Sequence, residues 1–413
     1  MSDQYSSDEL NPPAWLNADF FKTALSKFLK EDSISIKNVE IRPGTKPGQH
    51  YASIMFRAEV TYDTKTSPNA VIKLILKTVP TEEGHKMEFM REATAFKTEM
   101  RMYEEVLPEI QKLLKGINDP LVIAPTLVYQ SNDPAPVIVF IDETPNGFKP
   151  YEKNLSFEEA QIAIQTLAKF HACSLFVNKN VKDLTLFDDC PYIPAPGRTD
   201  FLQFFFMKGM IDSVKATREW EGEEALADKL EKNLEVFEQR VREVFNDYTK
   251  QSHQVLVHGD FQFRNMIFRN EGAKSEDFLL LDYQYCYWNT PAIDIFGLLY
   301  NVCNEDVRVH HRNDVLMKYH QVFKETLEKL NYNGPIPRLL DIQMELLRAG
   351  IFEYMMVLYF VPFQFIDLTK LDFEEVMEKK DFFSLTKEAF HSKEFKEVCI
   401  KRLKHFIEMG VLD

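Results

Sequence analysis

Apolar and polar positions alternate with a period of two in the first third of the chain. The clearest run is Ala52–Tyr62, in which every second position from 54 to 60 is apolar. Val39–Arg42 is a second strand-like run, and Ala70–Val79 is a third, rich in Val, Ile and Leu and ended by Pro80. The short Ser67-Pro68-Asn69 connection between the last two runs predicts a hairpin or meander.

Helical spacing appears on both sides of this sheet. Pro12 opens a predicted helix that runs to about Lys30. Apolar residues at 89, 93, 96, 100 and 103 predict a second helix that ends before Pro108. Two further strands are predicted at Ala124–Tyr129 and Pro136–Ile141.

From Phe157 onward the pattern becomes mainly helical. It is interrupted by three short strand-like runs at Val255–His258, Met266–Arg269 and Phe278–Leu281, and helices return after residue 291. A sheet-rich first third followed by a helical remainder predicts an α+β, bilobal protein. We place the boundary at the turn-rich segment after residue 142, which gives an N-lobe of residues 1–142 and a C-lobe of residues 143–413.

Composition excludes several classes of protein. A net charge of −15 and a pI near 5.3 disfavour nucleic-acid binding, which depends on basic patches. The five cysteines are odd in number and lack CxxC spacing, so neither a disulfide framework nor a zinc site is indicated. The polar start does not resemble a signal peptide, and the most apolar stretch, Ile351–Ile366, is shorter than a membrane span. We expect a cytoplasmic monomer with no membrane partner.

The most specific pattern is HGDFQFRN at positions 258–265, directly after an apolar strand. Asp260 and Asn265 share this loop, and Asp282 ends the apolar run Phe278–Leu281. Phosphoryl transfer requires a carboxylate at the acceptor hydroxyl and oxygen ligands for Mg²⁺. Each residue alone also fits a structural role. Their order and strand context together favour a base at Asp260 with metal ligands at Asn265 and Asp282.

A phosphate-binding cation and its acidic partner are expected before this loop. Lys77 lies at the end of the third predicted strand, and Glu99 lies on the following helix, which fits a strand-lysine and helix-glutamate pair. Lys73 is on the same strand face and competes with Lys77. The turn Pro43–Ser53, which includes Gly48, lacks GxGxxG, but its backbone amides and the Ser53 hydroxyl could contact phosphates; an ordinary hairpin is the alternative.

These motifs resemble the ecdysteroid kinase-like family, which is related to choline kinases and aminoglycoside phosphotransferases. The resemblance extends over nearly the whole chain and is carried by Pro13–Leu16, Gly48–Ser53, Leu76–Pro80, Phe96–Tyr103, Leu167–Ala172, residues 258–265 and Asp282–Gln284.

The resemblance implies a protein-kinase-like fold that binds ATP and Mg²⁺. It implies that Lys77 holds the ATP phosphates, and so favours Lys77 over Lys73. It places the adenine-binding connector near Phe140–Glu143, which includes Ile141 and Asp142, and makes Asp294 a structural acid. The chain departs from the family at His50, where Asn is frequent, and at Ile141-Asp142-Glu143, where a Glu-Asp-Leu-like connector is usual.

The acceptor is expected to be a small-molecule alcohol rather than a peptide. Asp282 begins Asp-Tyr-Gln instead of Asp-Phe-Gly, and Pro291 follows too soon for a peptide-docking segment. Two aromatic-rich stretches, Phe201–Met207 and Ile351–Phe363, suggest an apolar pocket or, alternatively, buried core helices. The resemblance implies ecdysteroids or similar hydroxylated lipophiles and toxins as acceptors. The competing hypothesis is a catalytically silent relative that binds an apolar ligand.

Smaller alternatives remain around the loop. His171 lies on an apolar helical stripe and fits a hydrogen-bonded core histidine better than a catalytic one. His258 precedes the predicted base and is expected to brace the loop. Arg264 could offset phosphate charge or form a surface ion pair.

Overall fold

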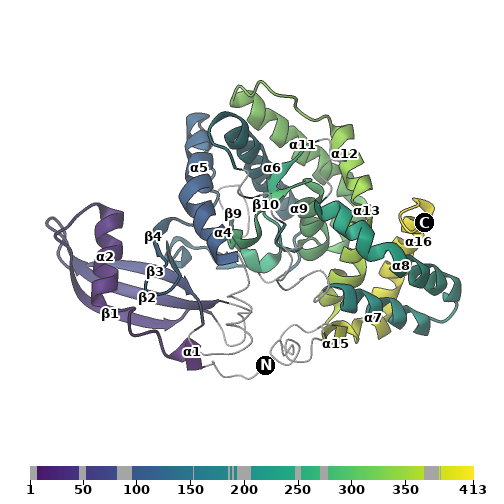
Figure 1. The fold of residues 1–413 in the computed structure, drawn as a ribbon, viewed down its shortest axis with the longest axis horizontal. Helices are drawn as coiled ribbons and strands as arrows, with labels where there is room; N and C mark the ends of the chain where they lie inside the picture. Colours follow the sequence, from purple (N-terminus) through teal and green to yellow (C-terminus); the bar gives the residue numbers. More distant parts are fainter. Residues whose placement is uncertain are drawn as a thin grey trace.

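A five-stranded antiparallel sheet forms the first lobe of the computed structural model (Figure 1). The structure describes residues 7–45, 53–80, 95–151, 153–184, 187, 190–192, 206–246, 253–269, 278–366, 381 and 383–413. The strands lie in the spatial order β1 (Ser35–Pro43), β2 (Ile54–Asp63), β3 (Ala70–Thr78), β5 (Val137–Ile141) and β4 (Leu127–Ser131).

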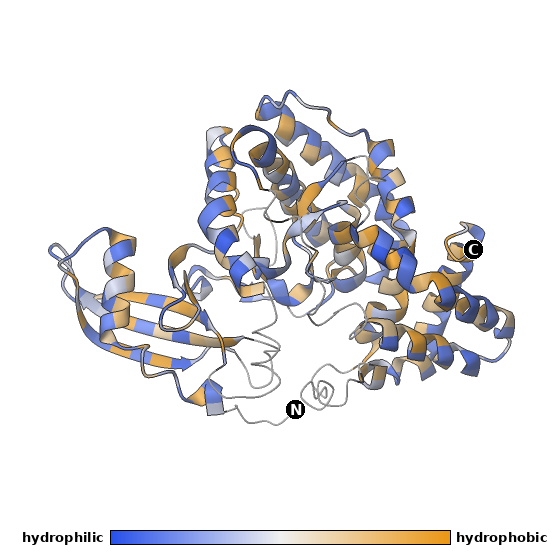
Figure 2. Ribbon diagram, in the orientation of Figure 1, coloured by the Kyte–Doolittle hydropathy of each residue, from blue (hydrophilic) through white to orange (hydrophobic). Residues whose placement is uncertain are grey.

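Alternating burial holds this sheet against α2 (Ala18–Leu29). Apolar and polar residues alternate along the strands (Figure 2), and Phe56 on β2 is fully buried in one core with Phe21 of α2. The helix begins later than the predicted Pro12. The reason is Asn17, whose side-chain oxygen accepts hydrogen bonds from the backbone N–H groups of residues 19 and 20 at 3.0 and 3.2 Å.

The helical segment after β3 differs from its prediction at Pro108. α4 (Ala95–Arg101) passes through a π-helical turn, Met102–Val106, directly into α5 (Leu107–Gly116). Pro108 therefore lies in the first turn of a helix instead of beyond the end of one. Proline has no N–H to donate, and it is placed here directly after a π-helical turn, where the regular α-helical hydrogen bonding is interrupted.

The second lobe is mainly helical, as predicted, and its core is continuous with the apolar side chains of α4 and α5. The long helix α6 (Phe157–Asn180) runs through its centre (Figure 1). The other helices are α7 (Lys208–Ala216), α8 (Glu224–Asn246), α9 (Ala292–Gly297), α10 (Glu305–His310), α11 (Arg312–Lys329), α12 (Leu339–Arg348), α13 (Gly350–Met355), α15 (Phe383–Thr386) and α16 (Lys393–Glu408), and a single turn, α1 (Ser7–Leu10), precedes the first lobe.

Two small β structures sit inside this helical lobe and carry the loops of interest. β7 (Val255–Val257) pairs with β10 (Tyr287–Asn289), and β8 (Met266–Phe268) pairs with β9 (Phe278–Leu280) and with β6 (Lys149–Pro150). The predicted α+β, two-lobed fold is confirmed.

The aromatic stretch Ile351–Phe363 is mostly core. Residues 351–359 are buried, and only the ring of Phe360 is partly exposed before the chain turns at Pro362. The counterpart at Phe201–Met207 lies outside the described residues except for its last two positions.

In the described part of the chain, no single helix has the length and apolarity to cross a membrane, although the bent pair Leu339–Arg348 and Gly350–Phe365 reaches that threshold by length and composition alone.

Candidate active site

The loop after β7 holds Asp260 in a closed set of hydrogen bonds. One carboxylate oxygen, Oδ1, accepts from Gln262 Nε2 at 2.8 Å, and the other, Oδ2, accepts from Asn265 Nδ2 at 2.9 Å. The same Asn265 nitrogen donates to the Asp260 carbonyl at 2.9 Å. Asn265 is thus anchored through its nitrogen, and its amide oxygen accepts no hydrogen bond from any described residue.

The electrostatic surroundings make Asp260 a stronger base than an ordinary aspartate. Burial raises the pKa of its carboxyl, and the nearby charge of Asp282 raises it further, while the hydrogen bond from Gln262 opposes the shift. A general base works best when its pKa approaches the operating pH. The upward direction of this pKa shift therefore suits the predicted role.

Asp282 lies just past the end of β9 on a tightly bent backbone. Its φ of 64° is in the left-handed region, which Asp tolerates better than bulky residues do. Gln284 holds the carboxylate in place, with Nε2 donating to Asp282 Oδ2 at 3.0 Å. This bend turns the carboxylate of Asp282 away from the strand direction and toward β3.

Three contacts join the Asp260 loop to the Asp282 loop. The N–H of Leu281 donates to the Asn265 carbonyl at 2.9 Å, and Met266 pairs with Leu280 in the β8–β9 hairpin. His258 Nε2 lies 2.9 Å from the Leu281 carbonyl, which requires a proton on that ring nitrogen. His258 therefore braces the two loops. Because the two loops form one hairpin unit, Asp260, Asn265 and Asp282 lie in one small region.

Lys77 brings the first lobe into contact with this region. Its side chain is buried, and Nζ lies 2.5 Å from Glu99 Oε2 on α4. The same ammonium contacts Asp282 Oδ1 and lies 3.3 Å from Gln284 Oε1. Lys73, in contrast, is exposed and pairs with Glu59 at 3.3 Å. α4 and the Asp282 loop cover the end of β3 but not its middle, so only Lys77 meets Glu99.

The buried charges of this cluster stabilise one another. Burial acts to lower the pKa of Lys77, but the carboxylates of Asp282 and Glu99 outweigh it, so the net shift is upward. Burial raises the pKa of Glu99, and Lys77 opposes that rise. The ammonium is therefore firmly charged. It provides a fixed cation beside the two loops.

Asp294 on α9 holds the backbone of the Asp260 loop through hydrogen bonds. Its carboxylate accepts hydrogen bonds from the backbone N–H groups of His258 and Gly259 at 2.6 and 2.9 Å. His171 Nε2 lies 3.0 Å from the same carboxylate, and His171 Nδ1 lies 2.8 Å from the Tyr319 hydroxyl. Burial lowers the pKa of His171, so a neutral imidazole is favoured. His171 is thus a hydrogen-bonded core histidine that orients Asp294.

The predicted nucleotide-contacting residues that the structure describes lie at two different levels of β3. Ser53 directly precedes β2, where Ile54 pairs with Thr78, so Ser53 lies at the Lys77 end of β3. Gly48 lies outside the described residues. Ile141 ends β5 and pairs with Leu74. The roles of these residues stay predictions.

Asp142 and Arg264 have surroundings that the sequence did not indicate. The Asp142 carboxylate forms an ion pair with Arg57 and accepts from the Thr144 N–H at 2.9 Å, and its own N–H donates to the Lys73 carbonyl at 2.9 Å. A nucleotide contact by Asp142 therefore stays a prediction that competes with these bonds. Burial lowers the pKa of Arg264 to about 10, and its guanidinium carbon lies 5.7 Å from the centre of the Phe263 ring.

Gln262 and Gln284 are the site residues whose roles sequence reasoning missed. Both belong to motifs that were singled out, but an amide two residues after a carboxylate gives no signal of its own. In the structure each donates to the aspartate two positions earlier, Asp260 or Asp282. They fix the orientation of the two carboxylates.

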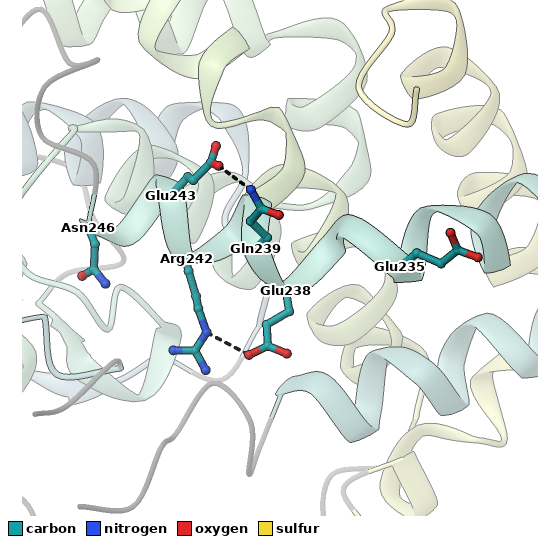
Figure 3. Close-up of a pocket in the computed structure, with 6 residues that line it drawn as sticks. All are labelled: Glu235, Glu238, Gln239, Arg242, Glu243 and Asn246. Atoms are coloured by element: carbon teal, nitrogen blue, oxygen red, sulfur yellow. Dashed lines mark hydrogen bonds and ion pairs between the residues drawn. The ribbon is translucent and has the colours of Figure 1, made fainter. Parts of the chain in front are cut away.

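A hollow of about 650 Å³ lies elsewhere, along the outer face of α8 (Figure 3). Its lining combines three glutamates with the neutral amides Gln239 and Asn246 and with Arg242, which pairs with Glu238 at 2.8 Å. None of the residues described above lines it. The hollow is therefore separate from the candidate site.

The two aspartates beside the β8–β9 hairpin and the buried lysine–glutamate pair fit a kinase-like phosphotransferase. The chain belongs to the ecdysteroid kinase-like family, whose model matches residues 47–332. The family predicted from the motifs is therefore confirmed, and with it the predicted enzyme class, a phosphotransferase with an alcohol group as acceptor. No curated protein matches the chain.

Several solved structures resemble the chain at low sequence identity. A macrolide 2'-phosphotransferase from Brachybacterium faecium is 12% identical, with 90% of this chain and 97% of that chain covered and a TM-score of 0.41. An aminoglycoside 2'-phosphotransferase-IIIa in complex with GDP is 12% identical, with 94% and 99% covered and a TM-score of 0.41. A choline/ethanolamine kinase family protein from Mesorhizobium loti is 12% identical, with 92% and 97% covered and a TM-score of 0.35.

Proposed function

We propose that this protein transfers the γ-phosphoryl group of ATP to a hydroxyl of an apolar small molecule, with Mg²⁺ as cofactor. The acceptor class is an ecdysteroid or a similar hydroxylated lipophile or toxin. The observation that carries the proposal is the meeting of Lys77 with Asp282 beside the Asp260–Asn265 loop. In this assignment residues 1–142 cover the nucleotide and residues 143–413 hold the acceptor.

Asp260 acts as the base in this proposal. Its carboxylate accepts the proton of the acceptor hydroxyl as that oxygen bonds to the γ-phosphorus, and the bond between γ-phosphorus and the bridging oxygen of ADP breaks. Gln262 and Asn265 hold the carboxylate still during this exchange. Lys77 offsets the negative charge of the phosphates, and Glu99 holds Lys77 in place.

The residues present fit a magnesium ion. Mg²⁺ prefers oxygen ligands and usually takes one or two from the protein, with the rest from phosphates and water. The partly exposed carboxylate of Asp282 and the amide oxygen of Asn265 are such donors, and no group of three or more His, Cys, Asp or Glu side chains forms a competing cage in the described residues. Bound there, the ion would neutralise phosphate charge during transfer.

Two measurements test the proposal. A thermal shift with Mg²⁺ and ATP tests nucleotide binding, because a ligand at about 100 times its dissociation constant adds about 2.7 kcal/mol to the free energy of unfolding. Incubation with ATP, Mg²⁺ and a panel of steroid and plant-derived alcohols, followed by mass spectrometry, tests transfer through products that are heavier by one phosphate. A protein that shows neither the shift nor a product in this panel contradicts the proposal.

A further inference from the structure

A row of aromatic rings begins beside the Asp260 loop and continues within the helical lobe. The ring of Tyr285 stacks on Tyr192, with centroids 5.6 Å apart and planes 17° apart. Tyr192 meets Phe206 edge-on at 6.0 Å, and Phe206 lies 5.8 Å from Phe360. These four side chains, which we call the aromatic wall, come from four separate segments of the chain.

The Tyr285 end of the aromatic wall is packed against the catalytic loop. The Tyr192 hydroxyl donates to the carbonyl of Gly259, the residue before Asp260. A Cβ atom on Gly259 would lie 2.2 Å from the Tyr285 carbonyl oxygen, so the two backbones touch. After burial, the charges of Asp260 and Asp282 are the next causes that raise the pKa of Tyr285. The backbone contact with Gly259 thus places Tyr285 beside the loop that carries Asp260.

The side chains of the aromatic wall keep some exposure to solvent, unlike the tyrosines next to Tyr285 in the sequence. All four of its side chains are partly exposed, whereas Tyr283 and Tyr287, on either side of Tyr285, are fully buried. Tyr283 donates its hydroxyl to the Ile123 carbonyl at 2.9 Å. The Tyr285 hydroxyl has no hydrogen-bond partner in the described part of the chain. A partly buried hydroxyl without a protein partner, next to the loop of Asp260, is available to form a hydrogen bond with a ligand.

We propose that Tyr285 is an acceptor-binding residue, whose hydroxyl bonds an oxygen of the acceptor alcohol while the aromatic wall packs against its ring system. This inference rests on the proposed function for the identity of the reaction. The aromatic wall predicts that acceptors with flat ring systems bind more tightly than acceptors with alkyl chains, a preference that the catalytic residues do not predict. The ring of Tyr192 is stacked on Tyr285 and on Phe245, so the contacts open to a ligand lie on Tyr285, Phe206 and Phe360. A flat ring system gains aromatic contacts there that a flexible alkyl chain does not gain.

Binding of two probe alcohols tests the assignment without requiring turnover. Naphthylethanol and octanol are both primary alcohols, one with a flat ring system and one with a flexible chain. Their dissociation constants are measured calorimetrically with Mg²⁺ and a non-hydrolysable ATP analogue present. The proteins are the wild type, Tyr285→Phe, Tyr285→Leu and the matched control Tyr354→Phe. Tyr354 is fully buried, and its hydroxyl has no partner in the described structure, so the control removes an equivalent hydroxyl away from the wall.

Tyr285→Phe is expected to weaken both alcohols about threefold to tenfold, the effect of one lost hydrogen bond. Tyr285→Leu is expected to remove, in addition, the advantage of naphthylethanol over octanol. Tyr354→Phe leaves both constants unchanged. The proposal is overturned if neither alcohol binds the wild type, or if the Tyr285 variants bind both as the wild type does.

The same proteins separate this inference from the proposed function. If the two Tyr285 variants change binding as expected but the wild type forms no phosphate ester, the aromatic wall stands and the kinase assignment falls. If ester forms and the Michaelis constant for the alcohol is the same in Tyr285→Phe and the wild type, the kinase assignment stands and the role of Tyr285 falls.

Discussion

The ammonium nitrogen of Lys77 lies 2.5 Å from a carboxylate oxygen of Glu99, 22 positions further along the chain. The same ammonium also contacts Asp282, which the helical lobe contributes. One charged group therefore links the sheet, the helix α4 and the Asp282 loop. This link adds to the apolar contacts by which α4 packs against the helical lobe.

Replacing Lys77 by methionine should reduce turnover with ATP by about a hundredfold to a thousandfold, because a fixed charge-stabilising donor is lost. It should also lower the free energy of unfolding by about 3 kcal/mol, since the buried carboxylate of Glu99 loses its cation. Lys73→Met is the matched control on the same strand face. Equal losses in the two variants, measured by steady-state kinetics and urea unfolding, would contradict the assignment.

Replacing Asp294 by asparagine should destabilise the protein by about 3 kcal/mol, because the new NH₂ group would face one of the two backbone N–H donors, which would lose its acceptor. Turnover should fall at least about tenfold as the Asp260 loop shifts. Asp228→Asn is the control, since that carboxylate is exposed and its ion pair with Arg218 contributes little. Urea unfolding with parallel activity assays measures both effects, and a fully active Asp294→Asn protein would show that the loop needs no such support.

Replacing Gly259 by alanine should cost far more than the same change at Gly222. Both glycines have a φ of 80°, where an L-residue is strained by about 1–2 kcal/mol. A Cβ at Gly222 meets nothing within 4 Å, whereas at Gly259 it would collide with the Tyr285 carbonyl. The collision is measured as the additional decrease in melting temperature of Gly259→Ala relative to Gly222→Ala, together with its loss of activity. Similar melting temperatures for the two variants would mean that the close contact is absent in solution.

Replacing Asp260 by asparagine should remove activity and yet stabilise the protein toward neutral pH. The folded state raises the pKa of Asp260 above its ordinary value of 3.8, so it binds this proton more tightly than the unfolded chain does. Ionisation of Asp260 therefore costs stability as the pH rises through that window. The difference in unfolding free energy between Asp260→Asn and the wild type should grow from about pH 4 upward and then level off.

A pair of further variants checks the cause of that pH effect. Burial is the first cause of the raised pKa of Asp260, and the charge of Asp282 is the second. In an Asp282→Asn background the stabilising effect of Asp260→Asn should therefore shrink. A difference that stays flat with pH in the wild-type background would show that the pKa of Asp260 is not raised, and an equal effect in both backgrounds would show that Asp282 does not contribute to the shift.

Much of the fold could be predicted from local sequence patterns, and the errors in that prediction have local physical causes. The period-two runs located β2 and β3 because one face of each strand is buried. The start of α2 and the path through Pro108 were predicted wrongly. A side-chain cap at Asn17 and a proline in a first helical turn both depend on hydrogen bonds that a hydrophobic pattern does not record.

Some residues of the candidate site could likewise be predicted from the sequence, and others could not. Asp260, Asn265 and Asp282 could be named because strand ends and short loops place them in sequence order. The choice of Lys77 over Lys73 could not be made from spacing, since both share one face of β3, and only the cover provided by α4 distinguishes them. The stack of Tyr285 on Tyr192 joins two distant segments through packing alone, so no sequence motif announces it.

The most direct test of the central claim is transfer of labelled phosphate from ATP to an accepted alcohol, compared between the wild type and Asp260→Asn under Mg²⁺ saturation. We predict a labelled phosphate ester from the wild type and a loss of turnover by orders of magnitude in Asp260→Asn, with ATP affinity retained. Near-normal turnover by Asp260→Asn would contradict the account.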